Sequence, residues 1–101
     1  MSKLKVLTDS DFHSTVDSQD LVLVKFSATW CGPCKALAPV VDKIAEEVSY
    51  PIYEVDIDDA MDVAAEFKIR GVPTLIAFKN GKVHNRLSGV ASKENILKLA
   101  E

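Results

Sequence analysis

Two cysteines are the residues of this sequence best suited to chemistry. Cys31 and Cys34 lie three positions apart, and the 101 residues contain no other cysteine. A disulfide-stabilised secreted domain usually carries more cysteines, spread along the chain. A zinc site would need two further ligands, and the only histidines, His13 and His84, lie far from the pair and from each other. The pattern therefore favours a redox-active dithiol over a metal site.

The residues around the pair predict a turn that leads from a strand into a helix. The nearly continuous apolar run over residues 21–27 is typical of a central strand buried on both faces. After the turn, apolar residues recur at helical spacing. Gly32 leaves the approach to Cys31 open, and Pro33 suits the first turn of a helix.

A helix start would make the two thiols chemically different. Free N–H groups and the helix dipole stabilise a thiolate there, so we expect a lowered pKa for the Cys31 thiol and nucleophilic reactivity near neutral pH. Cys34, one turn further on, should be more buried and remain a thiol. Two inert structural cysteines are the alternative, which is disfavoured because the pair does not lie on an apolar helical stripe.

Strands and helices alternate along the rest of the chain. Asn80-Gly81 is a strong signal for a type I′ hairpin between the last two strands. Strands alternating with helices favour parallel pairing, to which the hairpin adds an antiparallel part. We therefore expect an α/β fold in one domain over residues 1–101. Its mixed five-stranded sheet should be flanked by four helices on both faces, with strands at residues 4–7, 21–27, 52–57, 74–79 and 82–88.

Capping residues predict where three of the helices begin. Thr8 should cap the first helix, with Asp11 as its capping-box partner. Asp58 or Asp59 should cap the third helix, and Ser92 the last.

Composition and charge exclude several classes of protein. With 48% hydrophobic and 27% charged residues, the chain is not disordered or of low complexity. Its net charge of -3 gives it no electrostatic reason to bind nucleic acid or an anionic membrane. No apolar run approaches membrane-spanning length. Because no apolar segment follows Met-Ser-Lys-Leu-Lys, we expect no secretory signal and a cytoplasmic location.

The segment Trp30-Cys31-Gly32-Pro33-Cys34-Lys35 resembles the active-site segment of the thioredoxin family. The resemblance covers essentially the whole chain, without an obvious insertion. A Cys-x-x-Cys motif alone is moderately specific, whereas the full set of matches in this order is highly specific. The further matches are Phe26, Ala28, Pro39, Gly71-Val72-Pro73-Thr74, Phe78-Lys79-Asn80-Gly81 and Gly89.

The resemblance implies a thioredoxin fold and a protein disulfide reductase. Cys31 would attack a substrate disulfide, and Cys34 would resolve the mixed disulfide and leave an intramolecular bond. The Gly-Pro dipeptide between the cysteines is similar to that of the reducing branch of the family. The resemblance implies no bound cofactor. As partners it implies protein disulfide substrates and a thioredoxin reductase or an equivalent electron donor, and we expect a monomer.

The resemblance also implies a substrate-binding rim around the cysteines. Pro73 matches the family's cis proline, which faces the pair, and the backbone at Val72 would then pair with an extended substrate segment. Trp30 would shield one side of the site, although an ordinary core aromatic is the alternative. The remaining rim residues implied are Gly32, Pro33, Thr74, Gly89 and Val90.

Two charged residues depart from the family pattern. Lys25 lies within an apolar run where resembling proteins usually carry a buried Asp beneath the resolving cysteine, and Glu54 falls where they usually carry a Lys. Acid and base look exchanged between strands. A buried lysine needs a partner, and Glu54 is a plausible one if the two strands are adjacent and parallel. In that case Lys25, or Glu54 through water, would take the part of the family's proton acceptor. The alternative is a Lys25 that reaches the surface and a solvated Glu54.

Two other functions stay open at this point. Small proteins that resemble thioredoxin can be accessory subunits of larger complexes, and the apolar rim would then be an interface. A thiol oxidase is the second alternative. The intact cysteine pair beside an otherwise complete rim favours the reductase.

Overall fold

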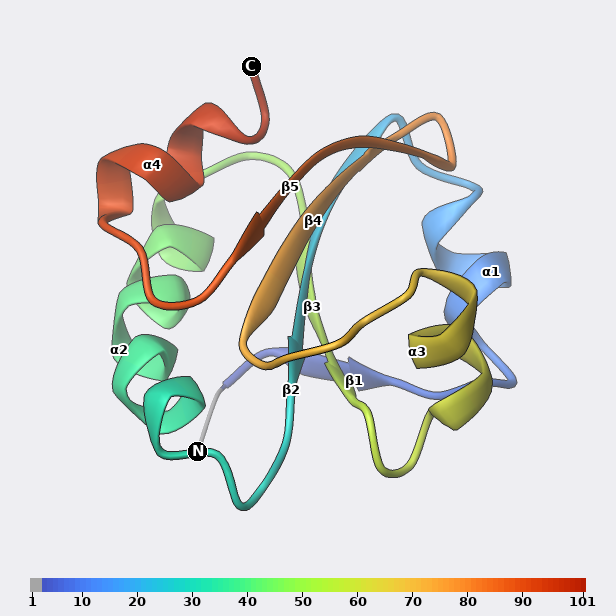
Figure 1. The fold of residues 1–101 in the computed structure, drawn as a ribbon. Helices are drawn as coiled ribbons and strands as arrows, with labels where there is room; N and C mark the ends of the chain where they lie inside the picture. The colour runs from blue at the N-terminus through green and yellow to red at the C-terminus, as the bar shows by residue number, and fades with distance from the viewer. Residues whose placement is uncertain (1–2) are drawn as a thin grey trace.

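Five strands cross the middle of the protein in the order β1-β3-β2-β4-β5 (Figure 1). The computed structural model describes residues 3–101. The β1/β3 and β2/β3 pairs are parallel, and the β2/β4 and β4/β5 pairs are antiparallel, which confirms the predicted mixed sheet. The strands are β1 (Lys5–Leu7), β2 (Leu21–Ser27), β3 (Ile52–Asp56), β4 (Thr74–Lys79) and β5 (Lys82–Ser88).

Helices cover both faces of this sheet, as the sequence predicts. The helices α2 (Gly32–Glu47) and α4 (Lys93–Lys98) lie on one face, and α1 (Phe12–Val16) and α3 (Met61–Glu66) lie on the other (Figure 1). Each layer has its own apolar core. Phe12, Phe26 and Phe78 are buried on the α1/α3 side, and Leu37, Ile44 and Ile96 are buried on the α2/α4 side. Among residues 3–101, no helix combines the length and apolar character needed to cross a membrane.

Two of the predicted local signals are confirmed. Asn80 and Gly81 both have positive φ, 53° and 80°, as a type I′ turn requires, and they join β4 to β5. Ser92 caps α4, and its hydroxyl oxygen accepts a hydrogen bond from Asn95 N–H at 3.2 Å.

The prediction that Thr8 caps the first helix is wrong. The regular helix begins at Phe12, and Asp11 is the N-cap residue, with no capping bond from its side chain. One half of the predicted capping box does form, because Thr8 N–H donates to Asp11 Oδ1 at 2.6 Å. The turn before α1 therefore starts at Thr8, whereas the helix starts one turn later.

The prediction for the start of α3 is also wrong. Neither Asp58 nor Asp59 caps this helix, whose N-cap residue is Ala60. Its free backbone donors are satisfied from outside, because the Asp9 carboxylate accepts a hydrogen bond from Val63 N–H at 2.9 Å. A carboxylate at a helix start also complements the helix dipole. Asp9 therefore joins the turn before α1 to the start of α3.

Asp9→Ala should destabilise the protein by about 1 kcal/mol, the usual effect of removing a capping side chain. Asp59→Ala is the matched control, since this acidic residue lies nearer in sequence to α3 and makes no capping bond to it. Urea unfolding of both variants measures the difference. An equal loss of stability in the two variants would contradict the assignment of the cap to Asp9.

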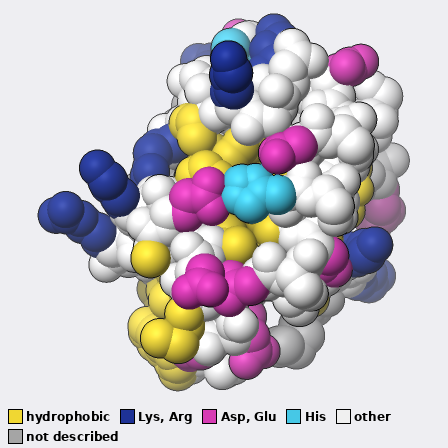
Figure 2. Space-filling view, turned by 90° about the vertical axis from the view of Figure 1, so that its right-hand side faces the viewer, with side chains coloured by type: hydrophobic (Ala, Val, Ile, Leu, Met, Phe, Trp, Pro, Cys, Tyr) yellow, Lys and Arg dark blue, Asp and Glu magenta, His cyan; other side chains and the backbone are white. Residues whose placement is uncertain are grey.

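A histidine links the same two helices at the surface. Acidic side chains lie beside a histidine on the face formed by α1 and α3 (Figure 2). His13 Nε2 lies 2.7 Å from Glu66 Oε1, and its Nδ1 lies 3.3 Å from Asp17 Oδ2. The hydrogen bond with Glu66 raises the pKa of His13 above its ordinary value of 6.5, against an opposing effect of burial.

His13→Gln should lower the free energy of unfolding at pH 5 and have little effect at pH 9. Because the pKa is raised in the folded state, the stabilisation is complete below 6.5 and is lost as the pH rises through the raised pKa. The loss should stay below about 1 kcal/mol, since half-exposed ion pairs are screened by solvent. Urea unfolding at both pH values measures it, and 1 M salt should shrink the difference. A destabilisation of the same size at pH 5 and pH 9 would count against the pairing.

Candidate active site

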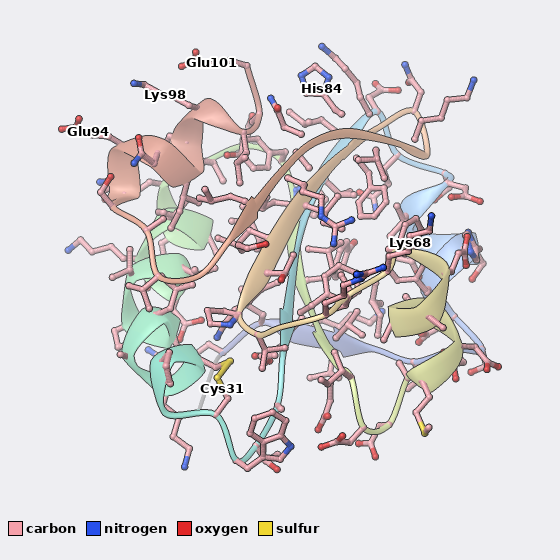
Figure 3. The ribbon with its side chains drawn as sticks, viewed as in Figure 1. Cys31, Lys68, His84, Glu94, Lys98 and Glu101 are labelled. Carbon is pink, nitrogen blue, oxygen red and sulfur yellow. A yellow bond between two sulfur atoms is a disulfide. The ribbon has the colours of Figure 1, made fainter. Side chains whose placement is uncertain are left out.

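The two cysteines lie where β2 ends and α2 begins, and they form a disulfide (Figure 3). Cys31 is the N-cap residue of α2, and its Sγ accepts a hydrogen bond from Cys34 N–H at 3.1 Å. Cys31 N–H in turn donates to the Ala28 carbonyl at 3.2 Å, which fixes the turn. The sulfur of Cys31 thus lies among the free donors of a helix start, where negative charge is stabilised.

The expected difference in burial between the two cysteines is not found. Cys31 is 4% exposed and Cys34 is 3% exposed in the disulfide form. Their surroundings differ instead. Cys31 Sγ lies 3.7 Å from the carbonyl oxygen of Val72, a residue in the loop before β4. Cys34 lines a cavity whose wall includes neither Cys31 nor Val72.

The loop before β4 meets the cysteine pair. The Val72–Pro73 peptide bond is cis, and Val72 packs against the cluster of Ala28, Cys31 and Cys34. Gly89 N–H donates to the Pro73 carbonyl at 2.8 Å. The hydroxyl of Thr74 donates to a carbonyl of the same loop, that of Gly71, at 2.7 Å. The structure therefore brings the predicted residues Val72, Pro73, Thr74 and Gly89 together in one region, in which Val72 contacts the cysteines.

Two predicted rim residues have exposed apolar side chains. Trp30 is 66% exposed and Val90 is 60% exposed, so the core alternative for Trp30 is wrong. Trp30 is held in place, because its Nε1–H donates to Asp58 Oδ2 at 2.9 Å. Asp58 N–H donates to Asp56 Oδ1 at 2.9 Å, which orders the loop that carries it. Sequence reasoning missed Asp58, since no local pattern links it to a tryptophan far away in the chain.

Lys25 and Glu54 form a buried pair behind the cysteines. They are register partners on the parallel strands β2 and β3, and Lys25 Nζ lies 3.4 Å from Glu54 Oε2. The side chains are 2% and 13% exposed, so the solvated alternative is wrong. Lys25 Nζ also donates to the Cys34 carbonyl at 3.2 Å. The hydroxyl of Ser27, which sequence reasoning also missed, donates to Glu54 Oε2 at 2.7 Å.

A cavity of about 180 Å³ adjoins this pair. Its wall includes Cys34, Lys25, Ser27 and Glu54, and it has room for several water molecules. The other lining residues are Val6, Ala28, Thr29, Lys35, Ala38, Asp56 and Asp59. Within residues 3–101, no three His, Cys, Asp or Glu side chains are grouped so that they could hold a metal ion.

Comparison with known proteins places this arrangement in a family. The family model described as Thioredoxin matches residues 3–101. This chain belongs to the thioredoxin family. Thioredoxins of Staphylococcus aureus strains Mu50 and MW2 are 41% identical to it over 103 aligned residues, which cover 100% of this chain and 97% of theirs. A solved mutant thioredoxin from Halobacterium salinarum NRC-1 is 30% identical, has a TM-score of 0.85, and is matched over 99% of this chain and 91% of its own.

Family membership and the cysteine pair together establish the reaction type. The chain is a thiol-disulfide oxidoreductase of the thioredoxin family, with the family's fold. Protein disulfides as substrates and reductases as partners follow from the family in general terms.

Breaking the Lys25–Glu54 pair should destabilise the protein asymmetrically. Glu54→Gln should cost about 3 kcal/mol, because it leaves a buried ammonium without a counter-charge. Lys25→Met should cost less, since Glu54 keeps its bond from Ser27 and is the more exposed partner. Urea unfolding of both single variants and the double variant measures the coupling.

The double variant should lose less stability than the sum of the single losses, by between about 0.5 and 3 kcal/mol. Lys35→Met is a suitable control because this lysine lines the same cavity but is exposed. Strictly additive losses for Lys25 and Glu54 would show that the pair is not coupled.

Proposed function

We propose that this protein is a general protein disulfide reductase in which Cys31 is the nucleophile and Cys34 is the resolving cysteine. The position of Cys31 carries the proposal. Its sulfur is the N-cap atom of a long helix and accepts a backbone N–H, so the helix start stabilises a thiolate at this atom. Cys34 lies within the first turn of the helix, where its own N–H makes that bond.

The reaction is a pair of thiol-disulfide exchanges. The Cys31 thiolate attacks one sulfur of a substrate disulfide, and the other substrate sulfur leaves as a thiolate. Cys34 then loses its proton and attacks Cys31 Sγ, which breaks the bond to the substrate and forms the Cys31–Cys34 disulfide. The substrate gains two electrons, and the cysteine pair loses them.

The surroundings of the pair support binding of an extended protein segment. Within residues 3–101, Val72 N–H donates to no backbone or side-chain acceptor. A substrate strand could therefore pair with this backbone beside Cys31. The exposed side chains of Trp30, next to Cys31 in the chain, and of Val90, next to Gly89, offer apolar contacts. Gly32 and Pro33 complete the rim, and Gly32 leaves open space at its Cα.

The Gly-Pro dipeptide between the cysteines and the similarity to the family's reducing branch support the reductive direction. This direction needs a thioredoxin reductase, or an equivalent donor, to restore the dithiol. It also needs a reducing compartment, and we place the protein as a monomer in the cytoplasm. Analytical ultracentrifugation tests the monomeric state.

Cys34→Ser should trap mixed disulfides with protein substrates, whereas Cys31→Ser should not. The trapped bond persists because the resolving thiol is gone. In the reduced wild-type protein, iodoacetamide should modify Cys31 before Cys34, because the thiolate is the reactive form. Mass spectrometry after timed quenching identifies the modified cysteine, and insulin reduction with dithiothreitol measures the activity. Trapping by Cys31→Ser would mean that Cys34 is the nucleophile. Equal alkylation of both thiols would contradict the assignment of different roles to the two cysteines.

A further inference from the structure

Three basic residues gather at the loop before β4. Lys68 and Arg70 belong to this loop, and Arg86 reaches it from β5. All three residues are exposed. In Figure 2, Lys and Arg side chains project at one edge of the molecule, apart from the acidic side chains beside the histidine. Positive charge is therefore concentrated here, although the net charge of the whole chain is -3.

The course of this loop is fixed by one bonded residue and one packed residue. Arg86 Nη1 donates to the Phe67 carbonyl at 2.7 Å, and its Nη2 donates to the Lys68 carbonyl at 3.2 Å. Ile69, between the two basic residues of the loop, packs against the apolar core on the α1/α3 side. The backbone is thus held in place, whereas the side chains of Lys68 and Arg70 stay at the surface.

These two side chains have no structural partner. Within residues 3–101, neither Lys68 nor Arg70 forms an ion pair or a side-chain hydrogen bond. Lys68 also has a φ of 53°, a left-handed conformation that glycine would adopt with less strain. The loop therefore carries a charged side chain where the backbone favours glycine, and neither charge is used to hold the fold together.

The basic loop residues lie close to the reactive sulfur along the chain. Arg70 precedes Val72 by two residues, and the Val72 carbonyl oxygen lies 3.7 Å from Cys31 Sγ. Two residues of chain span no more than about 7 Å. A substrate segment paired with the backbone at Val72 would therefore bring a residue about two positions from its own cysteine within reach of Arg70.

We propose that Lys68 and Arg70 select substrates with acidic residues close to the reactive disulfide. This proposal rests on the proposed function and on the pairing of a substrate segment at Val72. The Arg70 guanidinium can donate two parallel hydrogen bonds to a carboxylate, and the Lys68 ammonium adds a second positive charge. The two residues take no part in the exchange of disulfides. They favour formation of the complex with an acidic segment and disfavour a basic one.

The acidic residues near this region have other partners. Glu66 precedes Lys68 by two residues, but its Oε1 lies 2.7 Å from His13 Nε2. The Asp58 carboxylate accepts the hydrogen bond from Trp30 Nε1–H. Because the rim thus carries charges of both signs, an acidic substrate residue is favoured only where it lies beside the basic loop. The position of the acid in the substrate should therefore matter more than the total charge of the substrate.

The test compares two disulfide-linked peptide dimers of identical composition. One carries Glu two positions from the cysteine on either side and Gln about six positions away, and the other has Glu and Gln exchanged. Since the two dimers have the same net charge, overall attraction does not distinguish them. At about 0.01 M salt, excess reduced protein should reduce the dimer with the near Glu about fivefold faster. Chromatography of the released peptide measures both rates, and 1 M salt should shrink the difference.

Lys68→Gln/Arg70→Gln should reduce the two dimers at rates within about twofold of each other. Lys82→Gln/Lys98→Gln is the matched control, because it also removes two exposed positive charges. Lys82 lies at the hairpin end of β5, and Lys98 lies on α4, far from Cys31 in Figure 3. This control should keep the full preference for the near Glu.

Equal rates for the two dimers in the wild-type protein would overturn the proposal. So would a preference that persists in Lys68→Gln/Arg70→Gln, or one that is lost in the control variant. If the Lys68→Gln/Arg70→Gln protein is inactive, Arg70→Gln alone should at least halve the preference, and an unchanged preference there would also overturn the proposal. Failure of the wild-type protein to reduce either dimer would instead reject the proposed function itself.

Discussion

An amino group buried on the central strand constrains the whole active-site end of this protein. Lys25 is 1% exposed and lies between apolar neighbours on β2, where an uncompensated charge would be strongly unfavourable. Its counter-charge comes from Glu54 because β2 and β3 are parallel and in a register that places the two residues side by side. Its other acceptor is the Cys34 carbonyl in the first turn of α2. One ammonium thus ties the second strand, the third strand and the active-site helix together.

The first turn of α2 meets two requirements at once. A helix start has backbone donors without partners, and here one of them is satisfied by the sulfur of Cys31. The Cys34 carbonyl is fixed from below by Lys25, so the resolving cysteine is held at both its donor and its acceptor. The turn therefore contacts the loop with Val72 through Cys31, and it contacts the buried Lys25–Glu54 pair through Cys34.

Sequence reasoning predicted the features that depend on local patterns. Periodicity predicted the order of strands and helices along the chain. Side chains acting within a few residues predicted the turn at Asn80-Gly81 and the cap at Ser92. The Lys25–Glu54 pair was expected from the resemblance to the family, which drew attention to both residues, and from the need of a buried charge for a partner. The parallel register of β2 and β3 supplies that partner. Contacts that join distant segments could not be read in this way. Asp9 replaces the expected cap of α3, and Asp58, expected as a cap, instead holds Trp30.

The Lys25–Glu54 pair shows how two strands give the members of one contact different surroundings. An acid on β2 and a base on β3 would balance the charge within the sheet as well as the observed arrangement does. The two places are not equivalent, however, because one side chain is 2% exposed and the other is 13% exposed beside an open cavity. Ser27 adds to the difference, because its small hydroxyl side chain lines the cavity and donates to the carboxylate. The two strands therefore place a charged pair behind Cys34, and the surroundings of each side chain decide which member of that pair meets water.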